Sequence, residues 1–213
     1  MKRIYVILTF VLLAAYPASA QTTENLLESG NLNGWTMFVD DADVDPATIY
    51  KLDNGVLRVE GQPFGFIRTN KVYGNFVLVV QWRWIGTPTN SGVFVYVQDE
   101  MKCWPNAIEC QLAAGRAGDF VLLGGSDLAN YNAPEGRPRP NFPVVQKKYD
   151  SSERPADEWN TMMVTAVNGN ITVVVNGVFQ NEGIGSMHRS GHIALQSEGG
   201  PIEFRNVTVT HIP

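Results

Sequence analysis

Short apolar runs that alternate with polar residues recur along the chain, and turn-forming residues separate them. Residues two apart in a strand share a face, so this alternation is typical of half-buried strands. The clearest signals are the pairs Asn54-Gly55, Asn168-Gly169 and Asn176-Gly177, each next to apolar runs. Asn-Gly favours a type I′ hairpin turn because both residues tolerate a positive φ. No window of about twelve residues after residue 20 has a helical period. The pattern therefore predicts an all-β protein.

Strands are expected over almost the whole chain. From Glu158 onward the sequence predicts strand, turn, strand, turn, strand, and then two further strands around Gly199-Gly200-Pro201. The earlier strands are predicted over Trp35–Val39, Thr48–Leu52, Val56–Val59, Phe64–Thr69, Phe76–Ile85, Val93–Gln98, Ala107–Leu112 and Phe120–Leu123. Many short strands with Gly, Pro and Asn between them indicate two antiparallel sheets packed as a jelly-roll sandwich.

One long segment, Gly124–Pro155, breaks the strand pattern and is rich in Gly, Pro, Asn and Arg. Loops of this length in a compact domain are usually functional or mobile. We expect it to border a groove, with one short strand near Phe142–Val145.

The N-terminus has the pattern of a cleavable secretory signal peptide over residues 1–20. Lys2-Arg3 precede the apolar run Ile4–Ala15, and Ala18-Ser19-Ala20 form a small-x-small cleavage site. No Cys stands at the cut, and the apolar run is too short to span a bilayer. We therefore expect one domain over residues 21–213, without a lipid anchor or membrane span, in the periplasm or secreted.

The net charge limits the classes of binding partner, and the cysteine content bears on whether the chain forms a disulfide. Removal of Lys2 and Arg3 with the leader changes the formal net charge from −5 to −7, which disfavours nucleic acid or an anionic membrane as partner. Export permits a disulfide between Cys103 and Cys110. Cys110 lies on the apolar parity of its strand, however, which favours a buried free thiol. The sequence leaves the pairing and the oligomeric state open.

The candidate functional residues are polar side chains on the face of each strand that points away from its apolar side. In the strand Ala107–Leu112, Glu109 and Gln111 point away from the apolar side, as Gln196, Arg83 and Arg205 do in their own strands. If these strands share one concave sheet, the surface offers carboxylate, amide and guanidinium groups that suit sugar hydroxyls. On their own outward parity, Phe94 and Tyr96 are expected to add a stacking face.

Six short motifs in a fixed order resemble a known family. They are Asn90-Ser91-Gly92-Val93, Glu109-Cys110-Gln111, Glu158-Trp159-Asn160, Asn176-Gly177, Gly191-x-Ile193-x-Leu195-Gln196 and Phe204-Arg205-Asn206-Val207. Over roughly residues 27–212 the chain resembles the 3-keto-disaccharide hydrolase domain family. The resemblance implies a concanavalin A-like, laminin G-like jelly roll that acts on glycosides oxidised at C3 of the sugar.

That chemistry defines what the site needs. A ketone at C3 acidifies the C2–H, so the glycosidic bond can break by elimination, after which water adds to the product. The route needs a base near C2, donors to the enolate oxygen and an acid for the leaving group. Glu109 is the expected base. Gln111, Gln196 and Arg205 on family motifs, and Arg83 on a looser match, are the expected substrate-binding donors.

One departure from the family pattern concerns the acid. Many members carry Asp-His after the Leu-Gln pair, where this chain has Ser197-Glu198. Glu198 is therefore the candidate replacement. The expected substrate is a saccharide or glycoside. No cofactor is expected, although a divalent metal stays open.

Other functions have less support. Ordinary glycoside hydrolysis needs two facing carboxylates, and the Glu-x-Asp-x-x-Glu strand of laminarinase-type jelly rolls is replaced here by Glu109 followed by Gln111. Ser91 lacks the Gly-x-Ser-x-Gly elbow of serine hydrolases. An early cluster of aspartates is more often a solvated turn than a metal site; it consists of Asp40, Asp41, Asp43 and Asp45. The spacing of the histidines is not that of metal ligands; they are His188, His192 and His211. The main alternative is a carbohydrate-binding module without turnover, followed by an interaction domain.

Overall fold

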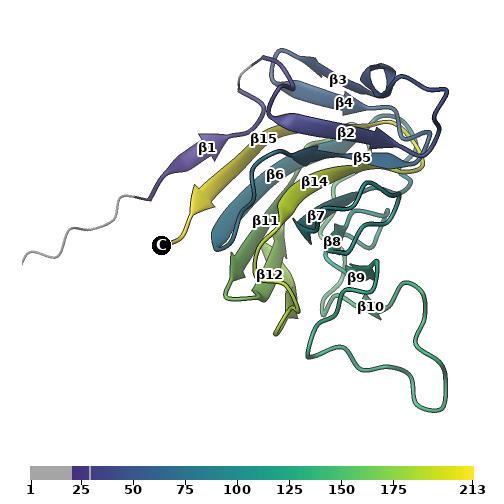
Figure 1. Ribbon diagram of the computed structural model, residues 1–213, viewed down its shortest axis with the longest axis vertical. Helices are drawn as coiled ribbons and strands as arrows, with labels where there is room; N and C mark the ends of the chain where they lie inside the picture. The colour runs from purple at the N-terminus through teal and green to yellow at the C-terminus, as the bar shows by residue number, and fades with distance from the viewer. Residues whose placement is uncertain (1–20, 29) are drawn as a thin grey trace, which may run out of the picture.

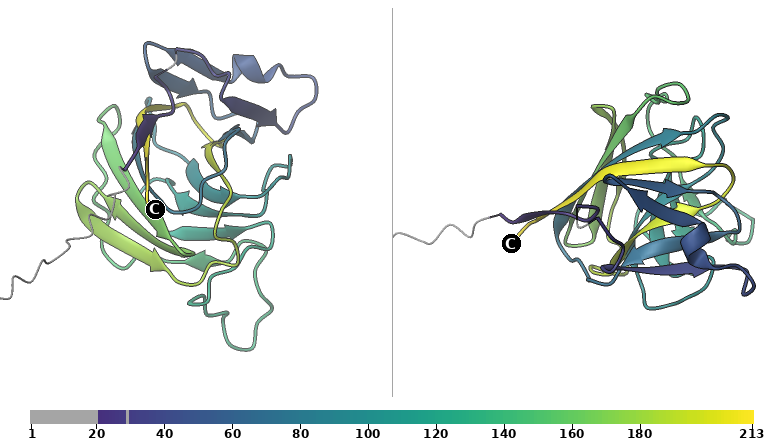
Figure 2. Two further views of the ribbon diagram at one scale, coloured as in Figure 1. Left: turned by 60° about the vertical axis from the view of Figure 1, so that its left-hand side comes forward. Right: turned by 90° about the horizontal axis from the view of Figure 1, so that it is seen from above.

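The structure, a computed structural model, describes residues 21–28 and 30–213, so the expected signal peptide lies outside the described residues. Strands make up nearly all of the regular structure, with one 3-10 turn, η1 (Pro46–Thr48). The strands form two antiparallel sheets that lie face to face as a sandwich (Figure 1). Figure 2 shows the same two layers from the side and from above. No helix within the described residues has the length and apolar character needed to cross a membrane.

Eight strands form the first sheet, in the order β13-β12-β11-β6-β15-β4-β3, with β1 paired to the end of β15. Their bounds are β1 Thr23–Asn25, β3 Tyr50–Asp53, β4 Val56–Val59, β6 Phe76–Trp84, β11 Asn160–Val167, β12 Asn170–Val175, β13 Val178–Gly183 and β15 Ile202–His211.

Seven strands form the second sheet, in the order β10-β9-β8-β7-β14-β5-β2. Their bounds are β2 Trp35–Val39, β5 Gly65–Thr69, β7 Gly92–Val97, β8 Ala107–Gln111, β9 Phe120–Leu123, β10 Val144–Val145 and β14 His192–Ser197. The predicted all-β jelly-roll sandwich is confirmed, and most strands start within two residues of their predicted positions.

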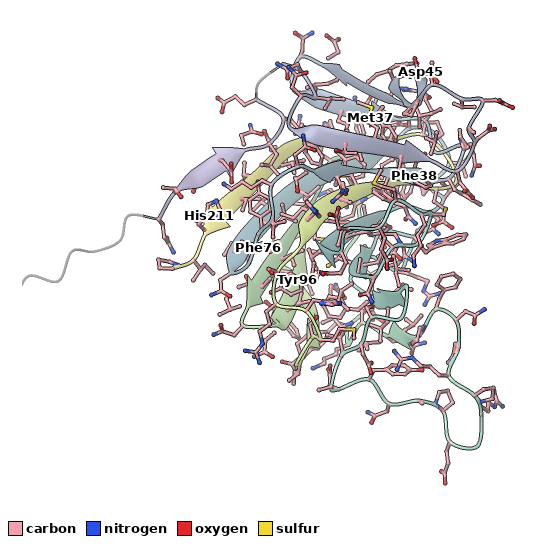
Figure 3. All side chains as sticks on the ribbon, viewed as in Figure 1. Met37, Phe38, Asp45, Phe76, Tyr96 and His211 are labelled. Carbon is pink, nitrogen blue, oxygen red and sulfur yellow. The ribbon has the colours of Figure 1, made fainter. Side chains whose placement is uncertain are left out.

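The main core lies between the sheets. Every second residue of β6 faces it, including the fully buried Trp82. On the neighbouring strand β15, Phe204 pairs with Trp82 and faces the same core. Each fully buried large apolar side chain contributes about 1.5–3 kcal/mol to folding. Alternation of side-chain direction is visible on β2, where Met37 packs against this core and Phe38 against the other side of the sheet (Figure 3).

A smaller apolar cluster covers the outward face of the seven-stranded sheet. Phe66, Phe94 and Val121 belong to it, and Trp104 from the β7–β8 loop packs against it. The polar residues that share this face are therefore partly enclosed by loops rather than fully solvated. This enclosed face carries the candidate site.

The three predicted Asn-Gly turns are confirmed. At Asn54-Gly55 the φ angles are 48° and 75°, and both other pairs are also in the left-handed region. Near Asn206 the β15–β6 register shifts between Arg205 and Thr208. The hairpin turns of the first sheet thus follow from local sequence.

The expected stacking face of Phe94 and Tyr96 is wrong. Tyr96 has a φ of 55°, and its side chain turns into the main core, where its ring meets Phe76 edge-on at 6.1 Å between centroids (Figure 3). Phe94 keeps its outward parity but is fully buried under the loops. Neither ring offers an open stacking face.

Candidate active site

β8 forms the floor of the candidate site. Ile108 and Cys110 point into the main core, as the alternation predicts, so Glu109 and Gln111 point to the outward face of the sheet. Loops cover this face, and Glu109 is only 3% exposed. A carboxyl group so deeply enclosed indicates a function, because burial without compensation costs folding free energy.

Glu109 needs the glycine on the neighbouring strand. Gly92 on β7 pairs with Gln111, and a Cβ built at Gly92 would collide with the carboxylate of Glu109 and lie 2.8 Å from its Cγ. The Glu109 side chain therefore crosses β7 in the direction of β14. Only glycine at position 92 leaves room for it.

Glu198 reaches the same place from the turn after β14. Its Oε2 accepts a hydrogen bond from Gln196 Nε2 at 2.6 Å, and the Asn90 side chain also bonds to it. The backbone N–H of Gly200 donates to Thr89 Oγ1 at 2.6 Å. This bond ties the turn that carries Glu198 to the loop that carries Asn90.

The surroundings of the two carboxyl groups change their pKa values to different extents. Burial, and then the negative charge of Glu198, raise the pKa of Glu109 well above its usual value. Burial also raises the pKa of Glu198, while hydrogen bonds from Asn90 and Gln196 oppose the rise. The environments thus separate the pair, with the proton favoured on Glu109 and the charge on Glu198.

Two amides line the site at fixed orientations. Gln111 Oε1 accepts from the N–H groups of Leu112 and Ala113 at 2.9 and 2.8 Å, so its NH₂ end is the end free to face the cavity that it lines. Gln196 is 3% exposed, and its Oε1 has no hydrogen-bond partner among the described residues, nor does Glu109 Oε1. Buried polar atoms without partners are uncommon and indicate a place for a ligand or water.

These groups open into a cavity of about 230 Å³. Its walls come from β9, β10 and five loops. Its lining residues are Asn90, Trp104, Glu109, Gln111, Arg116, Val121, Leu123, Phe142, Val144 and Glu198. The predicted role of Gly124–Pro155 as the border of a groove agrees with Phe142 and Val144 in this wall.

An aromatic wall stands on one side of the cavity. Trp104 lies 5.3 Å from Phe142 and 6.1 Å from Phe64, measured between ring centroids. Phe64 and Phe142 are exposed on their outer sides. Aromatic faces beside convergent polar groups are the usual lining of small-ligand sites.

Arg116 supplies the positive charge of the cavity. Its Nε and Nη2 donate to Asp119 Oδ2 at 2.9 and 2.8 Å, which fixes the guanidinium, and its side chain remains 52% exposed. The sequence did not single out this residue, because it lies in the turn between β8 and β9 outside the family motifs.

Arg83 and Arg205 do not join Glu109. They lie on β6 and β15 of the eight-stranded sheet, where their guanidinium groups stack on the Trp159 ring at 4.7 and 4.0 Å. Arg83 also pairs with Glu203 at 2.7 Å. The expectation of one shared polar sheet is therefore wrong, whereas Glu109, Gln111, Gln196 and Glu198 do come together.

The other candidate groups have structural roles. Asp45 caps η1, and Asp41 accepts from the N–H of Asp43 at 3.0 Å. Ser91 donates to the Gln196 carbonyl at 2.9 Å and is fully buried. Among the described residues no three His, Cys, Asp or Glu side chains are grouped to hold a metal ion.

Both cysteines are free and buried, so the disulfide alternative is wrong. Burial raises the pKa of Cys103 to about 11. Burial, and next the charge of Glu109, raise the pKa of the Cys110 thiol as well. Neither thiol is activated as a nucleophile.

Sequence reasoning missed part of the site. Trp104 and Arg116 come from loops that carry no periodic signal. Phe142 was expected only at the start of a short strand, and Asn90 was named only within a family motif. A signal for Gly92 was present in the Asn90-Ser91-Gly92-Val93 motif, since a glycine inside a strand often marks a close approach.

The buried Glu109 carboxyl, the partly buried Glu198 carboxyl, the amides and the aromatic wall on a jelly-roll sheet are typical of a glycoside hydrolase-like or carbohydrate-binding protein. The chain belongs to the 3-keto-alpha-glucoside-1,2-lyase-like domain family, whose model matches residues 22–210. This confirms the family that the sequence motifs resemble. No curated protein matches the chain in sequence.

Solved structures share the fold at low sequence identity. A Parabacteroides distasonis protein provisionally assigned as a glycosyl hydrolase is 21% identical, with a TM-score of 0.64 over 90% of this chain and 94% of that chain. The carbohydrate-binding module CBM66 from Bacillus subtilis has a TM-score of 0.58 at 11% identity, over 84% and 96%. A Bacillus licheniformis beta-glucanase has a TM-score of 0.57 at 11% identity, over 91% and 98%.

Proposed function

We propose that this protein cleaves 3-keto-glycosides by elimination at the Glu109–Glu198 pair. The observation that carries the proposal is the buried Glu109 carboxyl, which faces a cavity that also contains a second carboxyl group. The family membership supports the substrate class. The aromatic wall of Trp104 and Phe142 suits the apolar face of a sugar ring.

The reaction moves two protons. A base removes the proton from C2, whose acidity comes from the C3 ketone, and the electron pair is held as the enolate of that ketone. The enolate then collapses to form the C1=C2 double bond as the C1–O bond breaks, and an acid protonates the departing oxygen. The enone product can add water in a later step, which would complete a net hydrolysis.

The environments of the two carboxyl groups divide these roles. Glu198 accepts hydrogen bonds from Gln196 and Asn90 that favour its charged form, so it acts as the base. Glu109 retains its proton to higher pH, so it acts as the acid for the leaving group. This reverses the expectation from sequence, in which Glu109 is the base, because sequence cannot rank the burial of two carboxyl groups.

Donors for the enolate oxygen lie in the same cavity. The guanidinium of Arg116 and the NH₂ group of Gln111 are each held in place from behind, by Asp119 and by backbone N–H groups respectively. Donors fixed before the reaction stabilise developing negative charge without reorganisation. They take the place that the sequence assigned to Arg83 and Arg205.

The decisive experiment compares 3-keto-glucosides with the matching unoxidised glucosides, using the purified chain from residue 21 onward. We expect cleavage of the keto form only. Cleavage of both forms would indicate direct displacement and contradict elimination. Cleavage of neither, with saturable saccharide binding, would favour the carbohydrate-binding module, for which the aromatic wall is the supporting feature.

Two variants test the division of roles. Nitrophenolate needs no proton to leave, so Glu109→Gln should still cleave a nitrophenyl 3-keto-glucoside while losing most activity on the methyl 3-keto-glucoside. Glu198→Gln should lose both activities. The opposite result would assign the base to Glu109, and full activity of both variants would place the reaction elsewhere.

Export forms part of the same proposal. Residues 1–20 are proposed to direct secretion and to be removed, which leaves Gln21 as the first residue. N-terminal sequencing of the protein from a periplasmic or culture fraction tests this. An intact Met1 terminus in the cytoplasmic fraction would contradict it.

A further inference from the structure

A second hollow adjoins the catalytic cavity and shares Arg116 with it. Its volume is about 440 Å³, and it is lined by the β8–β9 turn, through Arg116 and Asp119, and by residues 146–150 after β10. A glycoside whose sugar lies at Glu109 and Glu198 could extend past Arg116 into this hollow. The leaving group is the part of the substrate that would occupy it.

Asp119 joins the two walls of the second hollow and is 3% exposed. Its Oδ1 accepts from the Lys147 N–H at 2.8 Å, and its Oδ2 accepts from Arg116 Nε at 2.9 Å. Both carboxylate oxygens thus have donors from the walls. The negative charge of Asp119 is already balanced by Arg116 and does not oppose an anionic ligand.

Lys147 leaves its positive charge available. Its Nζ donates to the backbone carbonyl of Tyr149 at 2.9 Å, and no ion pair within the described part of the chain includes it. The neighbouring Lys148 differs, because its Nζ pairs with Glu182 at 2.5 Å. An ammonium held by a neutral carbonyl at the rim of a hollow can still attract a carboxylate.

Tyr149 adds a flat apolar surface beside this charge. Its ring is held edge-on against Phe179, with 6.2 Å between centroids, and the residue is 58% exposed. A fixed and open aromatic ring can stack on a planar or sugar-like group. The hollow therefore combines a stacking surface with a cation that is in no ion pair among the described residues, and the exposed carboxylate of Asp150 lies on the same lining.

We propose that this second hollow is the leaving-group subsite and that it selects an aglycone carrying a carboxylate, which Lys147 binds. The inference rests on the proposed elimination at Glu109 and Glu198. The protein as a whole is acidic, with a formal net charge of −5 for the full sequence and −7 without residues 1–20. Long-range charge would repel an anionic substrate, so a preference for one must come from local cations.

The test uses the 3-keto-glucosides of 4-hydroxybenzoate and of 4-hydroxybenzamide, which differ mainly in charge. We expect the protein to prefer the benzoate by about fivefold in kcat/KM, a size typical of one exposed ion pair. Lys147→Met should abolish the preference and leave the benzamide rate unchanged. Lys51→Met, a lysine of the other sheet, should behave like the unaltered protein.

Measured binding affinities provide a second test of the subsite that does not depend on turnover. In the Glu198→Gln background, calorimetry should show tighter binding of the benzoate glycoside, and Lys147→Met should remove the difference. Equal kcat/KM for the two glycosides, or a preference that survives Lys147→Met, would overturn the subsite while the elimination activity stands. A binding preference without cleavage of either compound would overturn the proposed function and retain the subsite.

Discussion

The carboxylate of Glu109 lies over Gly92 on the next strand, so close that any side chain at position 92 would displace it. The geometry of the candidate cavity therefore depends on the absence of a side chain at position 92 as much as on the side chains that line it. Because the two residues are diagonal neighbours on the paired strands β7 and β8, their coupling can be measured directly.

Gly92→Ala should move Glu109 out of position. We expect a loss of about 1–3 kcal/mol in the free energy of unfolding, as for other overpacked sites, together with at least a tenfold fall in kcat. In a Glu109→Ala background the same change should cost much less, because the colliding atoms are gone. Denaturant titration of the four variants measures this coupling.

Gly34→Ala is the matched control, since a Cβ there meets nothing within 4 Å. A similar loss in both glycine variants would mean that general backbone effects, and not contact with Glu109, explain the result.

The stability of the protein should fall with rising pH because of Glu109. The pKa of this group is raised in the folded state, so the unfolded chain releases the proton first. Folding free energy is then lost progressively from the unfolded pKa, near 4.5, up to the folded pKa, by ~1.4 kcal/mol for each unit between them.

Glu109→Gln cannot ionise and should not show this loss. Urea unfolding at pH 4.5 and pH 7.5 should give a wild-type free energy that decreases relative to the variant. A constant difference between the two proteins over that interval would indicate an ordinary pKa for Glu109.

The pH dependence of turnover should reveal both carboxyl groups. Activity requires Glu198 charged and Glu109 protonated, so kcat/KM for a methyl 3-keto-glucoside should be bell-shaped. The acidic limb should lie above pH 4.5, since the pKa of Glu198 is raised. With a nitrophenyl leaving group the alkaline limb should disappear, because no acid is needed. An alkaline limb that is the same for both substrates would contradict the role of Glu109.

Trp104→Ala should weaken substrate binding with little effect on the chemical step. Loss of one stacking ring corresponds to roughly 1 kcal/mol or more, so we expect KM to rise about five- to tenfold. Trp159→Ala removes the ring next to β11 of the other sheet on which Arg83 and Arg205 stack, and it should leave KM unchanged. Steady-state kinetics of both variants decide which sheet binds the sugar. A raised KM for Trp159→Ala alone would assign binding to the two arginines.

Local sequence was sufficient for the strands and turns, because their determinants are short-range. Asn176-Gly177 forms its hairpin through backbone preferences of those two residues. The alternation in β8 likewise places Glu109 and Gln111 opposite Ile108 and Cys110 without knowledge of any partner strand.

Tertiary structure decided which polar faces meet. Arg83 and Glu109 both point away from the main core, yet they lie on opposite outer faces of the sandwich, and alternation cannot tell two sheets apart. The Tyr96 side chain points into the main core because Tyr96 itself has a positive φ, which the surrounding sequence does not predict.

The sequence by itself therefore determined the all-β class, the hairpins and the outward direction of the residues on β8. Only the packed structure shows that Glu198 lies in the same cavity as Glu109 and that loops contribute Arg116 and Trp104 to it. It also shows that Arg83 and Arg205 lie on the other sheet, outside the candidate site. The physical reason is that side-chain direction follows from the backbone of each strand, whereas the burial, charge coupling and pKa of a carboxyl group depend on residues far away in the chain.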